Sequence, residues 1–143
     1  MSSFDRQVAK YALEYAERFR AVARTAVNDT AHMASVPVGK GGRMRIDTGF
    51  LRASIQGAVQ SMPSGPTTNE GKRNYPAGSF ISGEPVAVAL LRWNPNDGTP
   101  FFVGWTANYA RKREAYDGFM RGAVEKWDQT VAKAAKKVEK GLG

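Results

Sequence analysis

The amino-acid sequence predicts a single α+β domain over residues 1–143, with a long N-terminal helix, a small central antiparallel sheet and a long C-terminal helix. Three observations support this prediction. Apolar residues recur every three or four positions in both terminal thirds of the chain, as in amphipathic helices. Two apolar runs bounded by turn residues lie between these thirds. A chain of 143 residues is also the usual length of one domain with one sizeable core.

The predicted N-terminal helix begins at Ser2 or Ser3, whose hydroxyl can accept a hydrogen bond from the first free N–H groups. It runs to about Met33 and stops before Pro37. At roughly 30 residues it would be about 45 Å long, which is longer than a domain of this size needs. We therefore expect part of its apolar stripe to contact another subunit. The stripe consists of Phe4, Val8, Tyr11, Ala12, Tyr15, Phe19, Val22 and Ala26.

A basic, glycine-rich segment follows, and a distinctive block comes after it. Residues 36–45 (VPVGKGGRMR) are expected to form a loop that is flexible over about 37–45. The glycine spacing does not match a phosphate-binding loop. In the block 46–55 (IDTGFLRASI), Asp47 is expected to cap a short turn and Gly49 to relax the backbone. Residues 58–61 are expected to be extended.

The centre of the chain combines a long irregular segment with the strongest strand signals. Residues 61–83 are rich in Pro, Gly, Ser, Thr and Asn, and such a length is unusual in a compact domain. This segment is either an arm that orders on assembly or a disordered insertion. Residues 85–93 (PVAVALLRW) and 100–107 (PFFVGWTA), joined by turn residues, are predicted to form an antiparallel hairpin.

Helical spacing resumes at Tyr116 and continues to Val138. Gly118 and Gly122 lie four residues apart, where they could permit close approach of another helix. Alternatively, the Asp117-Gly118 pair interrupts the helix, and the C-terminal helix starts later.

The net charge of +8 comes from 21 Lys and Arg against 13 Asp and Glu. Residues 1–46 and 108–143 each carry +4, and residues 47–107 are neutral. A basic excess attracts nucleic acid, anionic membranes or acidic protein surfaces, or it forms a solvated face that maintains solubility. The candidate contacts with DNA or an acidic surface are Lys40, Arg43, Arg45, Arg111, Lys112 and Arg113.

The composition excludes several classes of chemistry. No cysteine is present, so disulfides and thiolate metal sites are excluded. The single histidine leaves only one imidazole for acid–base chemistry. The longest apolar run, residues 86–91, is far shorter than the roughly 20 residues that span a bilayer. With no secretory signal visible, we expect an intracellular protein that makes no membrane contact.

An enzyme is not supported by the motifs. Residues 47–49 (DTG) form the tripeptide of aspartic proteases, but Phe50 follows them and Arg45 stands where an apolar strand is needed. His32 lies near Asp29, yet no nucleophile elbow is present. The acidic residues lack metal-site spacing. We therefore expect no catalytic residue, no metal and no cofactor.

A basic DNA-binding accessory protein is the alternative function. Tyr109 and Tyr116 lie among the basic residues of the C-terminal third, where aromatic rings could stack on bases. The sequence contains no zinc finger, and its helical segments are too long for a helix-turn-helix.

The block Asp-Thr-Gly-x-Leu-Arg-x-Ser-Ile after a long helix is followed by two further motifs. Tyr-Ala-x-x-x-Glu occurs at 109–114 and Gly-x-x-Arg-x-Ala at 118–123. In this order, the motifs resemble those of the small neck, tail-completion or minor tail proteins of long-tailed bacteriophages. Two features depart from the family pattern. The glycine that usually follows the glutamate closely is displaced to 118, and the segment 61–83 is long.

The resemblance implies a non-catalytic virion protein at the head–tail (neck) interface, in a ring around the DNA channel, with six copies favoured. Its partners would be other copies of itself, head-closure proteins, tail-tube or tail-terminator proteins and, without sequence specificity, packaged DNA. It would occur in the virion and, during assembly, in the cytoplasm of the bacterial host. Asp47 and Arg52 would brace a turn or a subunit contact. The implied assembly residues are Asp47, Thr48, Gly49, Leu51, Arg52, Ser54, Ile55, Tyr109, Ala110, Glu114, Gly118 and Arg121.

Overall fold

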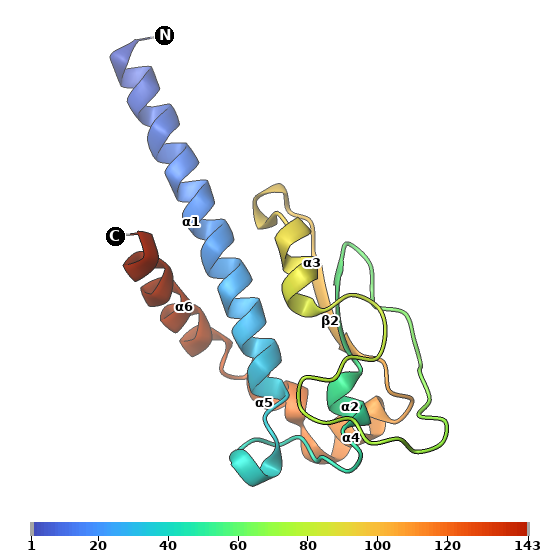
Figure 1. Cartoon of the computed structure of the whole chain (residues 1–143). Helices are drawn as coiled ribbons and strands as arrows, with labels where there is room; N and C mark the ends of the chain where they lie inside the picture. Colours follow the sequence, from blue (N-terminus) through green and yellow to red (C-terminus); the bar gives the residue numbers. More distant parts are fainter. Residues whose placement is uncertain (1, 143) are drawn as a thin grey trace.

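The computed structural model describes residues 2–142 and confirms the α+β architecture. The long N-terminal helix α1 (Ser3–Ala34) and the long C-terminal helix α6 (Trp127–Leu142) lie side by side, and the other elements surround the C-terminal half of α1 (Figure 1). These elements are, in chain order, η1 (Val38–Lys40), α2 (Phe50–Ala53), β1 (Ile55–Val59), α3 (Val86–Arg92), η2 (Pro95–Asp97), β2 (Phe101–Trp105), α4 (Ala110–Asp117) and α5 (Phe119–Val124).

Helix α1 begins and ends as its sequence predicts. The Ser2 hydroxyl accepts a hydrogen bond from the Asp5 N–H at 3.1 Å, and the Asp5 carboxylate accepts one from the Ser2 N–H at 3.3 Å. This reciprocal capping box satisfies two N–H groups that the helix leaves free. The helix ends at Ala34, three residues before Pro37. Its 32 residues correspond to a length of about 48 Å.

Only part of α1 packs on the rest of the domain. The Arg24 guanidinium donates to the Trp93 carbonyl oxygen at 2.8 Å, and the Asn96 amide donates to the Ala16 carbonyl oxygen at 2.9 Å. On the α6 side, Lys137 pairs with Asp29 at 2.8 Å. The N-terminal end of α1 projects beyond all of these contacts (Figure 1).

The two strands pair antiparallel, with Ile55 opposite Trp105 and Val59 opposite Phe101. The predicted strand within residues 100–107 is therefore confirmed. Its partner is β1, which begins three residues earlier than the extended stretch predicted at 58–61. The predicted hairpin with residues 85–93 is wrong, because those residues form α3.

A helix replaces the predicted strand at 85–93 because it packs directly on β1. Val86, Ala89 and Leu90 are buried, which is one helical face, whereas a strand would bury alternate residues. Gly57 of β1 makes the close approach possible, since a Cβ there would lie only 2.9 Å from the Val86 Cα. Periodicity alone cannot distinguish a short apolar helix from a buried strand.

The segment 36–45, predicted to be a loop, folds back on itself around η1. The Val38 N–H donates to the Met44 carbonyl oxygen at 3.0 Å, and the Met44 N–H donates to the Val36 carbonyl oxygen at 3.3 Å. Met44 is fully buried in a core cluster that also contains Phe50 and Phe119. This methionine therefore anchors the glycine-rich segment to the core.

The C-terminal third consists of three helices in place of one continuous helix. Gly118 adopts a left-handed conformation (φ 62°) between α4 and α5, and α6 starts only at Trp127. The alternative in which Asp117-Gly118 interrupts the helical spacing is therefore correct, but the helix resumes at once as α5, and α6 starts late because of a second break at 125–126. Among residues 2–142, no helix has the length and apolarity that crossing a bilayer requires.

The segment 61–83, called the arm below, contains no helix and no regular strand. It nevertheless lies against the domain along its length. The N–H groups of Thr67, Tyr75 and Ile81 donate to the carbonyl oxygens of Thr106, Thr48 and Ala53, at 2.6, 2.6 and 3.2 Å respectively. The arm therefore covers the 46–55 block.

Candidate functional site

The 46–55 block forms a tight turn that leads through α2 into β1. Thr48 caps the turn, because its hydroxyl oxygen accepts from the Phe50 N–H at 3.2 Å. The prediction that Asp47 supplies this cap is wrong, and its side chain is exposed. Phe50 and Leu51 point into the core, while Ser54 is buried and donates to the Leu51 carbonyl oxygen at 2.7 Å. The apolar and small residues of the block are therefore structural.

Gly49 is the point at which the arm crosses this turn. Its φ of 85° lies in the left-handed region, which glycine adopts without steric cost. A Cβ at Gly49 would also overlap the carbonyl oxygen of Tyr75. The Phe50 ring packs between Tyr75, at a centroid distance of 5.6 Å, and Tyr109, at 6.3 Å. Three segments distant in sequence thus meet at one aromatic cluster.

The second motif connects α4 to α5 through Glu114. Its carboxylate accepts from the N–H groups of Met120 and Arg121 at 2.8 and 2.9 Å, so it caps the first turn of α5. The left-handed Gly118 makes the reversal between the two helices possible. Gly118 and Glu114 thus both stabilise the short connection between α4 and α5.

Gly118 and Gly122 leave room for the Arg43 side chain. The prediction that a second helix approaches closely at these glycines is therefore wrong. A Cβ at Gly122 would lie 2.9 Å from the Arg43 Nε, and one at Gly118 would lie 3.3 Å from an Arg43 terminal nitrogen. Arg43 therefore lies across α5 and lines a second, smaller hollow.

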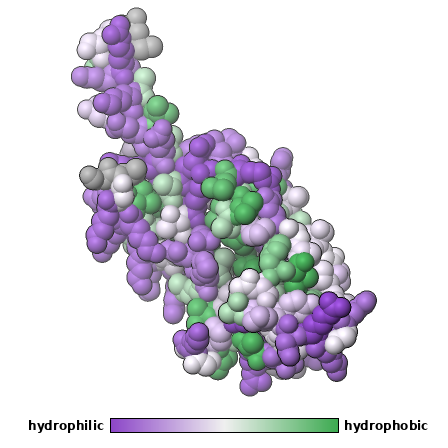
Figure 2. Space-filling model, viewed as in Figure 1, coloured by the Kyte–Doolittle hydropathy of each residue, from purple (hydrophilic) through white to green (hydrophobic). Residues whose placement is uncertain are grey.

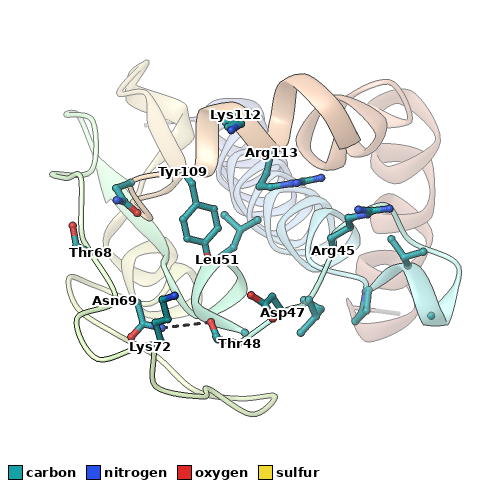
Figure 3. Close-up of a pocket in the computed structure, with 16 residues that line it drawn as sticks. Arg45, Asp47, Thr48, Leu51, Thr68, Asn69, Lys72, Tyr109, Lys112 and Arg113 are labelled. Carbon is teal, nitrogen blue, oxygen red and sulfur yellow. Dashed lines mark hydrogen bonds between the residues drawn. The ribbon is translucent and has the colours of Figure 1, made fainter.

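A groove with a volume of about 1070 Å³ lies beside the 46–55 block (Figure 3). Its sides come from four segments: residues 37–39, residues 45–51, the arm at 68–72 and the start of α4 at 108–113. Tyr109 lies near the middle of the view, with basic side chains around it. The charged lining residues are Arg45, Asp47, Lys72, Lys112 and Arg113.

The pKa values of Tyr109 and Asp117 are shifted in this region. Burial raises the pKa of the Tyr109 phenol, which keeps the hydroxyl neutral. The hydrogen bonds from Arg113 lower the pKa of the Asp117 carboxyl. Arg113 and Asp117 form a two-pronged ion pair at 2.7 and 2.9 Å. Arg113 thus has its charge balanced, whereas Arg45, Lys72 and Lys112 take part in none of the ion pairs within residues 2–142.

The groove brings together half of the predicted basic contacts and five of the predicted motif residues. Arg45, Lys112 and Arg113 line it, as do Asp47, Thr48, Gly49, Leu51 and Tyr109, whereas Lys40, Arg43 and Arg111 do not. The remaining motif residues serve the fold or lie outside the groove: Arg52 and Ala110 are half-buried, Ile55 lies in β1, and Arg121 is exposed on α5.

Sequence reasoning missed the part of the groove that the arm supplies. Asn69 and Lys72 line it, and the Asn69 side chain closes a turn by accepting from the Arg73 N–H at 3.1 Å and donating to the Arg73 carbonyl oxygen at 2.9 Å. The composition of the arm predicted a long irregular segment, and no local pattern indicated which surface it would cover. Within residues 2–142, no three His, Asp or Glu side chains converge as a metal site would require.

Comparison with protein-family models, with curated proteins and with solved structures finds no match for this chain.

Proposed function

We propose that this protein is a non-catalytic structural subunit of a tailed-phage virion, which assembles through α1 into a ring at the head–tail interface. The observation that carries the proposal is the uncovered apolar stripe on the projecting end of α1. Phe4, Tyr11 and Tyr15 are 72%, 66% and 79% exposed, and Val8 and Phe19 are each 50% exposed. The same spacing continues to Ala26, which is fully buried in the packed half of the helix.

An isolated helix as short as the projecting end of α1 is only marginally stable in water. A partner that covers its apolar stripe would therefore stabilise this end most. Figure 2 shows a largely hydrophilic surface on the side of the projecting end that faces the viewer, with hydrophobic atoms along one edge. An amphipathic helix that extends beyond its own domain suits packing against a neighbouring copy. The order of the three motifs supports the choice of a phage neck or tail-completion protein, with six copies favoured.

The test compares two acidic substitutions on α1. Tyr15→Asp places a charge in the centre of the stripe. Leu13→Asp is the matched control, because Leu13 is 61% exposed but lies about 160° from Tyr15 around the helix axis. We expect the wild type and the control to form rings, measured by light scattering and electron microscopy, and Tyr15→Asp to remain monomeric.

In the phage that encodes the chain, loss of the gene should leave heads and tails unjoined. The Leu13→Asp gene should restore joined particles and the Tyr15→Asp gene should not. Normal particles in the absence of the gene would refute the virion role, and equal assembly of both variants would refute the role of the stripe.

A further inference from the structure

We propose that the groove beside the 46–55 block binds the sugar–phosphate backbone of duplex DNA, without reading its sequence. The groove carries an excess of positive charge. Four cationic side chains line it against the single carboxylate of Asp47. Arg113 is balanced by Asp117. Arg45, Lys72 and Lys112 are exposed and contribute the excess positive charge.

These three cations converge on the groove from separate parts of the chain. Arg45 is the last residue of the folded-back segment 36–45, Lys72 belongs to the arm and Lys112 lies on α4, so that the fold brings together charges from three distant segments. Figure 3 shows these side chains at different edges of the groove around Tyr109. Separated cations along one groove suit a polymer with a regularly repeated negative charge, such as a nucleic-acid backbone.

Uncharged polar side chains complete the lining of the groove. Hydroxyl and amide groups, which commonly donate to phosphate oxygens, also line the groove. They belong to Thr48, Thr68, Asn69, Asn108 and Tyr109. The preference for DNA over an acidic protein also rests on the proposed function, in which the ring encloses the DNA channel. Contacts of this kind position a duplex without specifying its sequence.

The experiment measures fluorescence anisotropy of a labelled 24-base-pair duplex with the full chain, between 50 and 200 mM NaCl. The test variant combines Arg45→Gln, Lys72→Gln and Lys112→Gln. The control variant removes the same charge from exposed positions of α6, through Lys133→Gln, Lys136→Gln and Lys140→Gln. Both variants are checked for wild-type circular dichroism and melting temperature.

Three phosphate contacts correspond to a change of about 2.7 in the slope of log affinity against log salt, or about 40-fold in affinity over this salt range. We expect the groove variant to lose this salt dependence and most of its affinity, and the α6 variant to change by less than about threefold. Equal effects of the two variants, or no binding by the wild type, would overturn the proposal.

Two further measurements keep the proposal testable if the triple variant misfolds. Asp47→Asn removes the only carboxylate of the groove and should tighten DNA binding severalfold, because like charge near the phosphates is lost; an unchanged affinity would contradict the proposal. Poly-L-glutamate, added at an equal concentration of charge, should compete weakly. Competition equal to that of unlabelled DNA would identify an acidic protein surface as the partner and overturn the assignment to DNA.

Failure of this inference is distinguishable from failure of the proposed function. The Tyr15→Asp variant tests assembly and leaves the groove intact, so it should bind DNA as a monomer. DNA binding without any role in particle assembly would support the groove and refute the virion role. Assembly without DNA binding would support the virion role and refute DNA binding by the groove.

Discussion

Substituting Gly49 with alanine tests whether the arm is held by the 46–55 block. An alanine at φ 85° costs roughly 1–2 kcal/mol, because its Cβ crowds the backbone. The new Cβ also overlaps the Tyr75 carbonyl oxygen, so the arm must move. It then loses the hydrogen bond from the Tyr75 N–H to the Thr48 carbonyl oxygen, about 0.5–1.5 kcal/mol, and the Phe50–Tyr75 ring contact, about 0.5–1.5 kcal/mol. The expected total is about 2–5 kcal/mol.

The matched control is Gly78→Ala in the same arm. Gly78 has a φ of 90° and no atom within 4 Å of its Cβ position, so only the backbone cost of roughly 1–2 kcal/mol applies. Urea unfolding followed by tryptophan fluorescence measures both free energies of unfolding. Trypsin should also cleave the displaced arm at Lys72 and Arg73 faster in Gly49→Ala. Equal losses of stability in the two variants would refute the reasoning, because the arm would then contribute nothing at Gly49.

Three other predictions concern the elements that support the groove. Glu114→Ala should lower the free energy of unfolding by about 1–2 kcal/mol through loss of the α5 cap, whereas Glu125→Ala, an exposed control, should change it little; equal effects would rule out capping. Met44→Ala should cost about 2–5 kcal/mol, since this side chain is fully buried, and a loss below about 1 kcal/mol in urea would show that the loop is not anchored there. The Asp117 carboxyl has a lowered pKa because of Arg113, so the stability of this pair is present above the ordinary value of 3.8 and is lost as pH falls below it. The urea midpoint should therefore fall less between pH 5 and pH 3 in Asp117→Asn than in the wild type.

The sequence predicted the features that depend on neighbouring residues. The Ser2 cap, the apolar spacing and Pro37 set the bounds of α1, because caps and periodicity act within a few residues. The strand within 100–107 was predicted for the same reason. The helix break at Gly118 was one of two alternatives, because a glycine can indicate either the end of a helix or a close contact with another element.

The tertiary structure decided the features that depend on distant partners. The run 85–93 is a helix because Gly57 of β1 leaves room for its backbone. The arm is placed by acceptors at Thr48 and Thr106, which no local pattern reveals. The groove likewise joins Arg45, Lys72 and Lys112 from segments that are remote in sequence. The sequence by itself therefore determined the long helix, the second strand and the amount of positive charge, whereas long-range packing determined which of those charges face one another.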